Sequence, residues 1–311
     1  MNRPLRWCVA ALTAAVLGHV GQAEAKALRI ALPPKPAMQA AQADVIVLGK
    51  VAEIEKDSVE ATQFKGAPKE QKVAYKIAVL KIEDPLVGAR GLTQLRVGFP
   101  ADAPAAGVEP VDSDKPQIAI ARRPIRPGFG GPVALTAGME GVFMLTPHHE
   151  GDFYVLVNNA APLLKKDEGY AKELESIKKT AAAIDDPVTA LKAKDKADRA
   201  AAAVTLLTRY RGRPVAGKVV EEDLPAEENK LLLQAVAEMP WVPENNDYTK
   251  PSRSNVWYFL QPEKYGFKQP VFKQPAPGAP PADFNKQWEE VTDEFLKTTG
   301  DKIKIKRMVG K

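Results

Sequence analysis

The sequence predicts two domains, a five-stranded β-barrel or sandwich followed by an all-α helical bundle. Three observations support this α+β organisation, in which strands and helices are segregated along the chain. Short β-branched or alternating apolar runs lie before residue 165, and apolar residues at helical spacing lie after it. The 27 prolines and 21 glycines supply the connections between these segments. We therefore expect a barrel domain at residues 26–165 and a helical domain at residues 166–311.

The first 25 residues have the pattern of a signal peptide. Arg3 and Arg6 precede the apolar run Cys8–Val20, and Ala23-Glu24-Ala25 offers small residues to a signal peptidase. The run is too short for a stable membrane span, so we expect cleavage near Ala25 and an exported protein, periplasmic or extracellular. The only cysteine lies in this segment, so the mature chain has no disulfides, thiolate zinc sites or cysteine nucleophiles.

Five predicted strands follow in chain order. They are Val45–Leu48, Val73–Val79, Leu95–Phe99, Val142–Leu145 and Phe153–Val157. Gly49 follows the first strand at a point where a barrel strand can bend, and Pro147–Gly151 is a hairpin-length connection between the last two. Residues 100–138 separate the third and fourth of these strands and contain seven prolines and five glycines. A segment this rich in proline cannot form the backbone hydrogen bonds of a central strand. This insertion is either a solvated loop or a segment that docks on a partner through the basic, extended stretch Arg122–Pro127.

Helical periodicity begins at Lys166. The first predicted helix is Lys166–Ala183, and a second begins at Asp186-Pro187. A third has an apolar stripe from Ala200 to Tyr210 and ends at Gly212. A fourth begins at Pro225, and the last has on one face Phe284, Trp288, Val291 and Phe295. Residues 240–281 carry nine prolines and many aromatic residues. They either wrap around the helices or present a stacking platform for sugars.

Charge and motifs exclude several functions. The net charge of +5 is small and evenly spread, so we expect no nucleic-acid binding. Gly212–Lys218 spells G-x-x-x-x-G-K, but Val219 stands where a P-loop needs Ser or Thr. The sequence has no G-x-S-x-G or H-E-x-x-H motif, so we assign no catalytic residue, no metal ligand and no cofactor. His148 and His149 are either solvated turn residues or, with Glu150 and Asp152, a metal or base site.

Three segments resemble a known group of proteins. Residues 43–51, 75–88 and 138–145 are similar to exported bacterial proteins of unknown function whose N-terminal domain is an OB-type barrel like that of the netrin and tissue-inhibitor-of-metalloproteinase modules. The resemblance covers about residues 40–160 and implies an OB-like barrel. Metalloproteinase inhibition in that group depends on an N-terminal cysteine, which this mature chain lacks. Residues 191–201 also look like one HEAT-type repeat.

Two functions remain open. The first is a non-catalytic binding module for a protein or an acidic polymer. OB barrels bind on the face of strands 2 and 3, between the loops that follow strands 1 and 4. The ligand-binding residues expected on those loops are Phe64, Lys65, Lys69, Lys72, His148 and His149. The second is an exported hydrolase with a metal or base site at His148 and His149.

Overall fold

The computed structural model describes residues 36–103, 133–215, 217–243, 245, 247, 250–271 and 283–311. The predicted signal peptide, most of the 100–138 insertion and part of the 240–281 segment lie outside these residues. Among the described helices, none is both long and apolar enough to cross a membrane.

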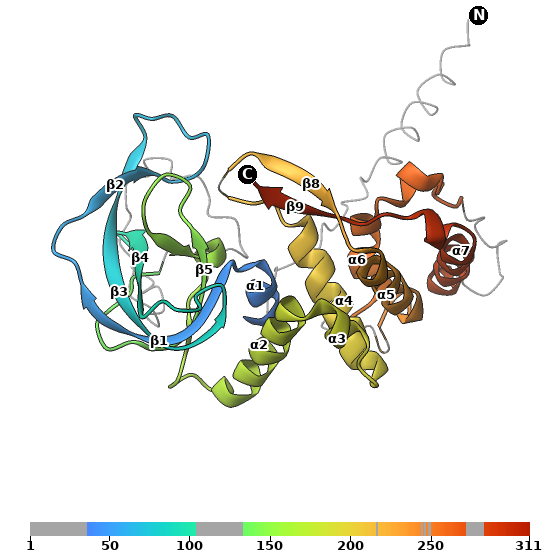
Figure 1. Ribbon diagram of the computed structural model, residues 1–311, viewed down its shortest axis with the longest axis horizontal. Helices are drawn as coiled ribbons and strands as arrows, with labels where there is room; N and C mark the ends of the chain where they lie inside the picture. The colour runs from blue at the N-terminus through green and yellow to red at the C-terminus, as the bar shows by residue number, and fades with distance from the viewer. Residues whose placement is uncertain are drawn as a thin grey trace, which may run out of the picture. The chain divides into compact units, whose positions relative to one another are not determined.

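The N-terminal half is a closed five-stranded β-barrel, as predicted, and not a sandwich (Figure 1). Its strands are β1 (Val45–Ile54), β3 (Lys72–Val87), β4 (Gln94–Pro100), β5 (Glu140–Pro147) and β6 (Tyr154–Leu156). β1 pairs antiparallel with both β3 and β5, β3 with β4, and β5 with β6, while a parallel pairing of β4 with β6 closes the ring. The strand order around the barrel is therefore β1-β3-β4-β6-β5. Each of the five strands overlaps one expected from the apolar pattern.

Alternation along these strands builds the barrel core. Val47, Leu80, Val97 and Phe143 point inward and are buried with other aliphatic side chains. Gly49 lies at an irregularity in the pairing of β1 with β3, in agreement with the expected bend. A Cβ atom on Gly49 would lie 2.4 Å from the carbonyl oxygen of Lys81, so only glycine permits this close approach.

Several elements of this half have no counterpart in the sequence prediction. They are helix α1 (Pro36–Gln42), strands β2 (Val59–Thr62) and β7 (Leu163–Leu164), and the 3₁₀ turn η1 (Val157–Asn159). β2 pairs with β3 outside the closed ring, and β7 pairs with β5. They are short, so their few residues carry little periodic signal.

All the described helices except α1 lie after the barrel in the chain. They are α2 (Tyr170–Asp185), α3 (Pro187–Leu191), α4 (Lys196–Arg211), α5 (Ala226–Glu238), α6 (Arg253–Val256) and α7 (Phe284–Thr299), with 3₁₀ turns η3 (Trp257–Leu260), η4 (Pro262–Tyr265) and η5 (Gly300–Lys302). Asp186 caps α3 as expected, because its side chain accepts a hydrogen bond from the backbone N–H of Thr189. Trp257 and Phe267 of the aromatic segment are buried in the helical core, where Trp241 stacks on Trp288.

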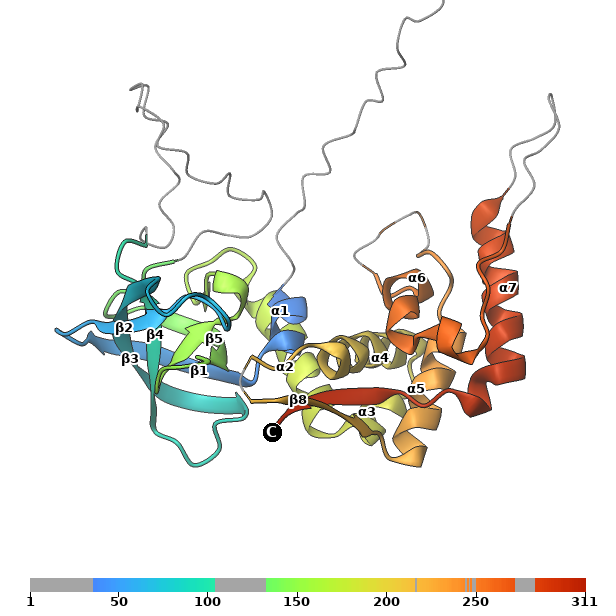
Figure 2. The same ribbon diagram turned by 90° about the horizontal axis from the view of Figure 1, so that it is seen from above.

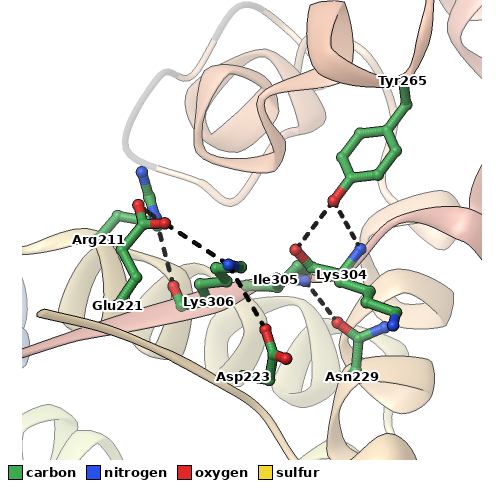
Figure 3. Close-up of polar contacts among 8 residues, drawn as sticks. All are labelled: Arg211, Glu221, Asp223, Asn229, Tyr265, Lys304, Ile305 and Lys306. Atoms are coloured by element: carbon green, nitrogen blue, oxygen red, sulfur yellow. Dashed lines mark hydrogen bonds and ion pairs between the residues drawn. The ribbon is translucent and has the colours of Figure 1, made fainter.

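The all-α description of the C-terminal half is not confirmed, because this half also contains a two-stranded sheet. β8 (Val219–Asp223) pairs antiparallel with β9 (Lys306–Gly310), and Figures 1 and 2 both show β9 running alongside α4. The chain entering β9 is anchored by side chains (Figure 3): Asn229 accepts from the N–H of Ile305 at 2.8 Å, and the Tyr265 hydroxyl donates to the Lys304 carbonyl at 3.1 Å.

One apolar cluster crosses the predicted domain boundary at residue 165. Ile46, Val142 and Met144 of the barrel strands pack with Ile177 and Ala181 of α2. The described residues belong to one compact unit, residues 33–311. The separation of the chain into independently folding halves at residue 165 stays a prediction.

Candidate functional site at the barrel rim

The β5–β6 hairpin is shaped by the ring of His148. Its Nδ1 atom accepts the backbone N–H of Gly151 at 3.0 Å and that of Glu150 at 3.3 Å. The backbone N–H of His148 donates to the carbonyl of Phe153 at 2.9 Å, which closes the turn. Because Nδ1 acts as an acceptor, the imidazole is neutral with its proton on Nε2.

Aromatic packing covers the hairpin and the adjacent barrel face. The ring of His148 stacks on Phe153 with centroids 4.6 Å apart, and Tyr75 of β3 contacts both rings at 5.3 and 5.2 Å. Phe153 lies over Gly98 of β4, where a Cβ atom would meet the ring at 2.4 Å. The absence of a side chain at Gly98 therefore lets the hairpin fold against the sheet.

Strand β2 is tied to the same hairpin through Thr62. Its backbone N–H and its hydroxyl both donate to Oε2 of Glu150, at 3.0 and 2.7 Å. The hydroxyl oxygen also lies 2.8 Å from Nε2 of His149. A hydroxyl has one proton, so Thr62 donates to Glu150 and accepts from the Nε2–H of His149. This arrangement, here called the Thr62 knot (Thr62, His149 and Glu150), joins the two loops on which the sequence placed the ligand.

The knot and the aromatic packing set the protonation of two groups. The hydrogen bonds from Thr62 lower the pKa of Glu150 below its usual value, so its carboxylate stays ionised. Burial lowers the pKa of His148, and the neighbouring His149 adds to this effect, while the backbone of Thr62 and the charge of Glu150 oppose it. His148 therefore stays neutral at pH values where an exposed histidine gains a proton.

This shift predicts a loss of stability on acidification. The folded-state pKa of His148 lies below the unfolded value of about 6.5, so the unfolded chain binds more protons between these two values. Stability should therefore fall as the pH falls from about 6.5 through that window. In urea unfolding between pH 7.5 and 5, His148→Asn, whose amide oxygen can replace Nδ1 as the acceptor, should show a flatter pH dependence. Equal slopes in the wild-type protein and in His148→Asn would contradict the prediction.

The structure places the predicted site residues in different surroundings. Phe64, Lys65, Lys69 and Lys72 are exposed on or beside the β2–β3 loop, whereas His148 is only 6% exposed. His149 is half-buried, so it is the imidazole of the pair that reaches the surface. The Nζ of Lys65 donates to the carbonyl of Gly217 at 2.6 Å.

Three residues of the site were not expected from the sequence: Thr62, Tyr75 and Phe153. Tyr75 and Phe153 lay on predicted strands, and their side chains cover the barrel from outside. Alternation alone does not separate a ring that covers the outer face from one that fills the core. Thr62 acts through Glu150, which lies 88 residues away in the chain, so no local motif marks it.

A small cavity of about 60 Å³ adjoins His148 and Tyr75. Its wall also includes Gly98, Phe99 and Asn159. Within the described ranges, no three His, Asp, Glu or Cys side chains come together as a metal site. A search of protein-family models and of curated proteins found no match to this chain.

Proposed function

We propose that this chain is an exported, non-catalytic binding protein that recognises an acidic protein or polymer at the rim of an OB-like barrel. The recognition surface consists of Phe64, Lys69, Lys72 and His149, where the β2–β3 loop and the β5–β6 hairpin meet. The signal-peptide pattern of residues 1–25 supports the assignment to the exported class.

The order of the barrel strands supports the OB-like assignment. The ring β1-β3-β4-β6-β5 closes through one parallel pair, β4 with β6, while its other pairings are antiparallel. This is the order of a five-stranded Greek-key barrel, in which the ligand lies over the second and third strands. Those strands here are β3 and β4, and the Thr62 knot lies at one end of them.

The Thr62 knot is the observation on which this proposal rests. It joins two loops that are far apart in the sequence through three hydrogen bonds of 2.7 to 3.0 Å. A preorganised rim binds more tightly than two loose loops, because less conformational entropy is lost on binding. Lys69 and Lys72 stay exposed beside it and supply positive charge.

The same contacts favour binding over hydrolysis. Thr62 is buried. Its hydroxyl is hydrogen-bonded to His149 and donates its proton to Glu150. Nδ1 of His148 is occupied by two backbone N–H groups. A general base needs a free acceptor nitrogen, and the imidazole of His148 presents none.

The test is binding of labelled poly-L-glutamate to the purified protein, followed by fluorescence anisotropy. Wild-type protein should bind, and its affinity should fall with added salt because exposed charges are screened. Lys69→Gln, Lys72→Gln and His149→Gln combined should weaken binding by about tenfold or more. Lys172→Gln with Lys178→Gln, two exposed lysines on α2, is the control and should bind as wild type.

Two outcomes would contradict the proposal. Unchanged binding by the folded triple variant would show that the binding site is not at the rim. Turnover of any ester, phosphate or glycoside substrate in a panel would support the alternative function as a hydrolase if His149→Gln abolishes it.

A further inference from the structure

A second loop lies beside the rim. The ammonium group of Lys65 donates to the carbonyl of Gly217 at 2.6 Å and so brings together segments 152 residues apart. Gly217 belongs to the α4–β8 connection, residues 212–218. Residues 63–72 together with the described residues of this connection form the two-loop surface.

Hydrogen bonds to the C-terminus hold the second loop in place. The N–H of Lys218 donates to the carbonyl of Lys311 at 2.6 Å, and the N–H of Lys311 donates back at 2.9 Å. Gly217 has a φ of +76°, and a Cβ atom there would lie 2.9 Å from the Lys311 carbonyl oxygen. Figure 1 shows the start of β8 beside the end of β9. The connection is therefore fixed by the β8–β9 sheet.

Positive charge is concentrated on the two-loop surface. Residues 63–72 carry three lysines and one glutamate, a charge of +2, and residues 212–218 add +2 through Arg213 and Lys218. The whole chain of 311 residues carries only +5. Lys69, Arg213 and Lys218 are exposed, and the ion pairs of the described residues do not include them.

The acidic residues of β8 leave this charge uncompensated, because they pair elsewhere. Glu221 faces Arg211 at 3.4 Å and Lys306 at 3.9 Å, and Asp223 faces Lys306 at 3.8 Å (Figure 3). Glu222 pairs with Arg307 and Lys311. The acidic strand β8 is thus neutralised by basic residues of α4, β9 and the C-terminus.

Apolar side chains accompany the cations on both loops. Phe64 is 60% exposed, and Val215 is 36% exposed on the α4–β8 connection. Neither belongs to a hydrophobic core of the described residues. Each of the two loops therefore presents an exposed apolar side chain together with exposed cations.

We infer that the two-loop surface binds an anionic phospholipid bilayer. Unpaired lysine and arginine side chains attract anionic headgroups, and a bilayer interface accepts exposed rings and aliphatic tips without a complementary pocket. A soluble polyanion bound at the rim would engage the cations of residues 63–72 but leave Val215 in water. The inference goes beyond the proposed function, and its one link to that function is the shared basic loop of residues 63–72.

Co-sedimentation of the full chain with vesicles tests this inference. The protein should sediment with vesicles of phosphatidylglycerol and phosphatidylcholine, should not sediment with phosphatidylcholine alone, and should be released by salt. Lys69→Gln with Arg213→Gln should weaken binding about 25-fold, since each cation near an anionic surface contributes about fivefold. Phe64→Ser with Val215→Ser should weaken it about tenfold.

Matched controls test whether the loss of vesicle binding is specific to the two-loop surface. Leu92→Ser removes a 47% exposed side chain outside the two-loop surface, and Lys172→Gln with Lys178→Gln removes two cations on α2. Both variants should bind vesicles as wild type does.

The results distinguish this inference from the proposed function. Binding to poly-L-glutamate without binding to anionic vesicles would overturn the lipid inference and leave the proposed function intact. Vesicle binding that is unchanged in Phe64→Ser with Val215→Ser would overturn it too, because the contact would then be purely electrostatic. Vesicle binding without poly-L-glutamate binding would support the lipid inference and count against the proposed function.

Discussion

Replacing Arg253 by alanine should lower the free energy of unfolding by about 3–5 kcal/mol, because a large buried side chain is removed together with the hydrogen bonds it donates. Arg253 is 1% exposed, at the start of α6. Its guanidinium donates to the carbonyls of Ala237 and Met239, both at 2.8 Å, and to the hydroxyl of Thr292, also at 2.8 Å, and it pairs with Asp293 at 2.5 Å.

The size of this effect follows from what the substitution leaves behind. The carbonyl groups lie at the C-terminal end of α5, where a helix has no partners of its own for its last carbonyls. Thr292 and Asp293 belong to α7, so one side chain joins α5, α6 and α7. Without the guanidinium these acceptors lose their donor, and a cavity the size of the side chain opens in the helical core.

Urea unfolding at pH 7.5 measures this effect. Arg90→Ala is the matched control: Arg90 is exposed and donates to Asp185 at 2.7 Å, and exposed pairs contribute less than about 1 kcal/mol. Arg253→Lys should recover only part of the loss, because an ammonium cannot reproduce the fork of a guanidinium. A loss in Arg253→Ala no larger than in Arg90→Ala would show that α5 and α7 are held together by other contacts.

Replacing Phe153 by alanine should also cost about 3–5 kcal/mol, the range for a buried phenylalanine, and should disorganise the candidate site. The ring is buried against Tyr75 and His148 and fills the space over Gly98. Without it, His148 loses its stacking partner, and the turn that presents Glu150 to Thr62 loses its support.

Two measurements separate packing from recognition. Phe64→Ala changes an exposed phenylalanine of the adjacent loop and should alter the unfolding free energy by less than about 0.5 kcal/mol. Phe153→Leu keeps most of the apolar volume and should fall between alanine and wild type. Wild-type affinity for poly-L-glutamate in Phe153→Ala, under conditions where that variant is folded, would mean that the rim does not depend on the hairpin.

Local periodicity was sufficient to predict the five strands of the barrel ring and helices α2, α4, α5 and α7. The strand around Ile77 and the helical stripe through Leu207 each repeat their apolar residues within one element, at a spacing set by backbone geometry. The cap at Asp186 is equally local, because the side chain bonds to a backbone group three residues later. The basic residues of the β2–β3 loop were found in the same way, since charged side chains in a connection are expected to be exposed.

The remaining features depend on pairs of residues that are far apart in the chain. β8 pairs with β9 across more than 80 residues, and neither strand is long enough to carry a clear alternation of its own. The Thr62 knot and the contact of Lys65 with Gly217 join segments 87 to 152 residues apart. Sequence reasoning placed His148 on the rim because a turn is usually solvated. Only the tertiary structure buries it, because Phe153 and Tyr75 close over the ring and two backbone N–H groups need its Nδ1 as their acceptor.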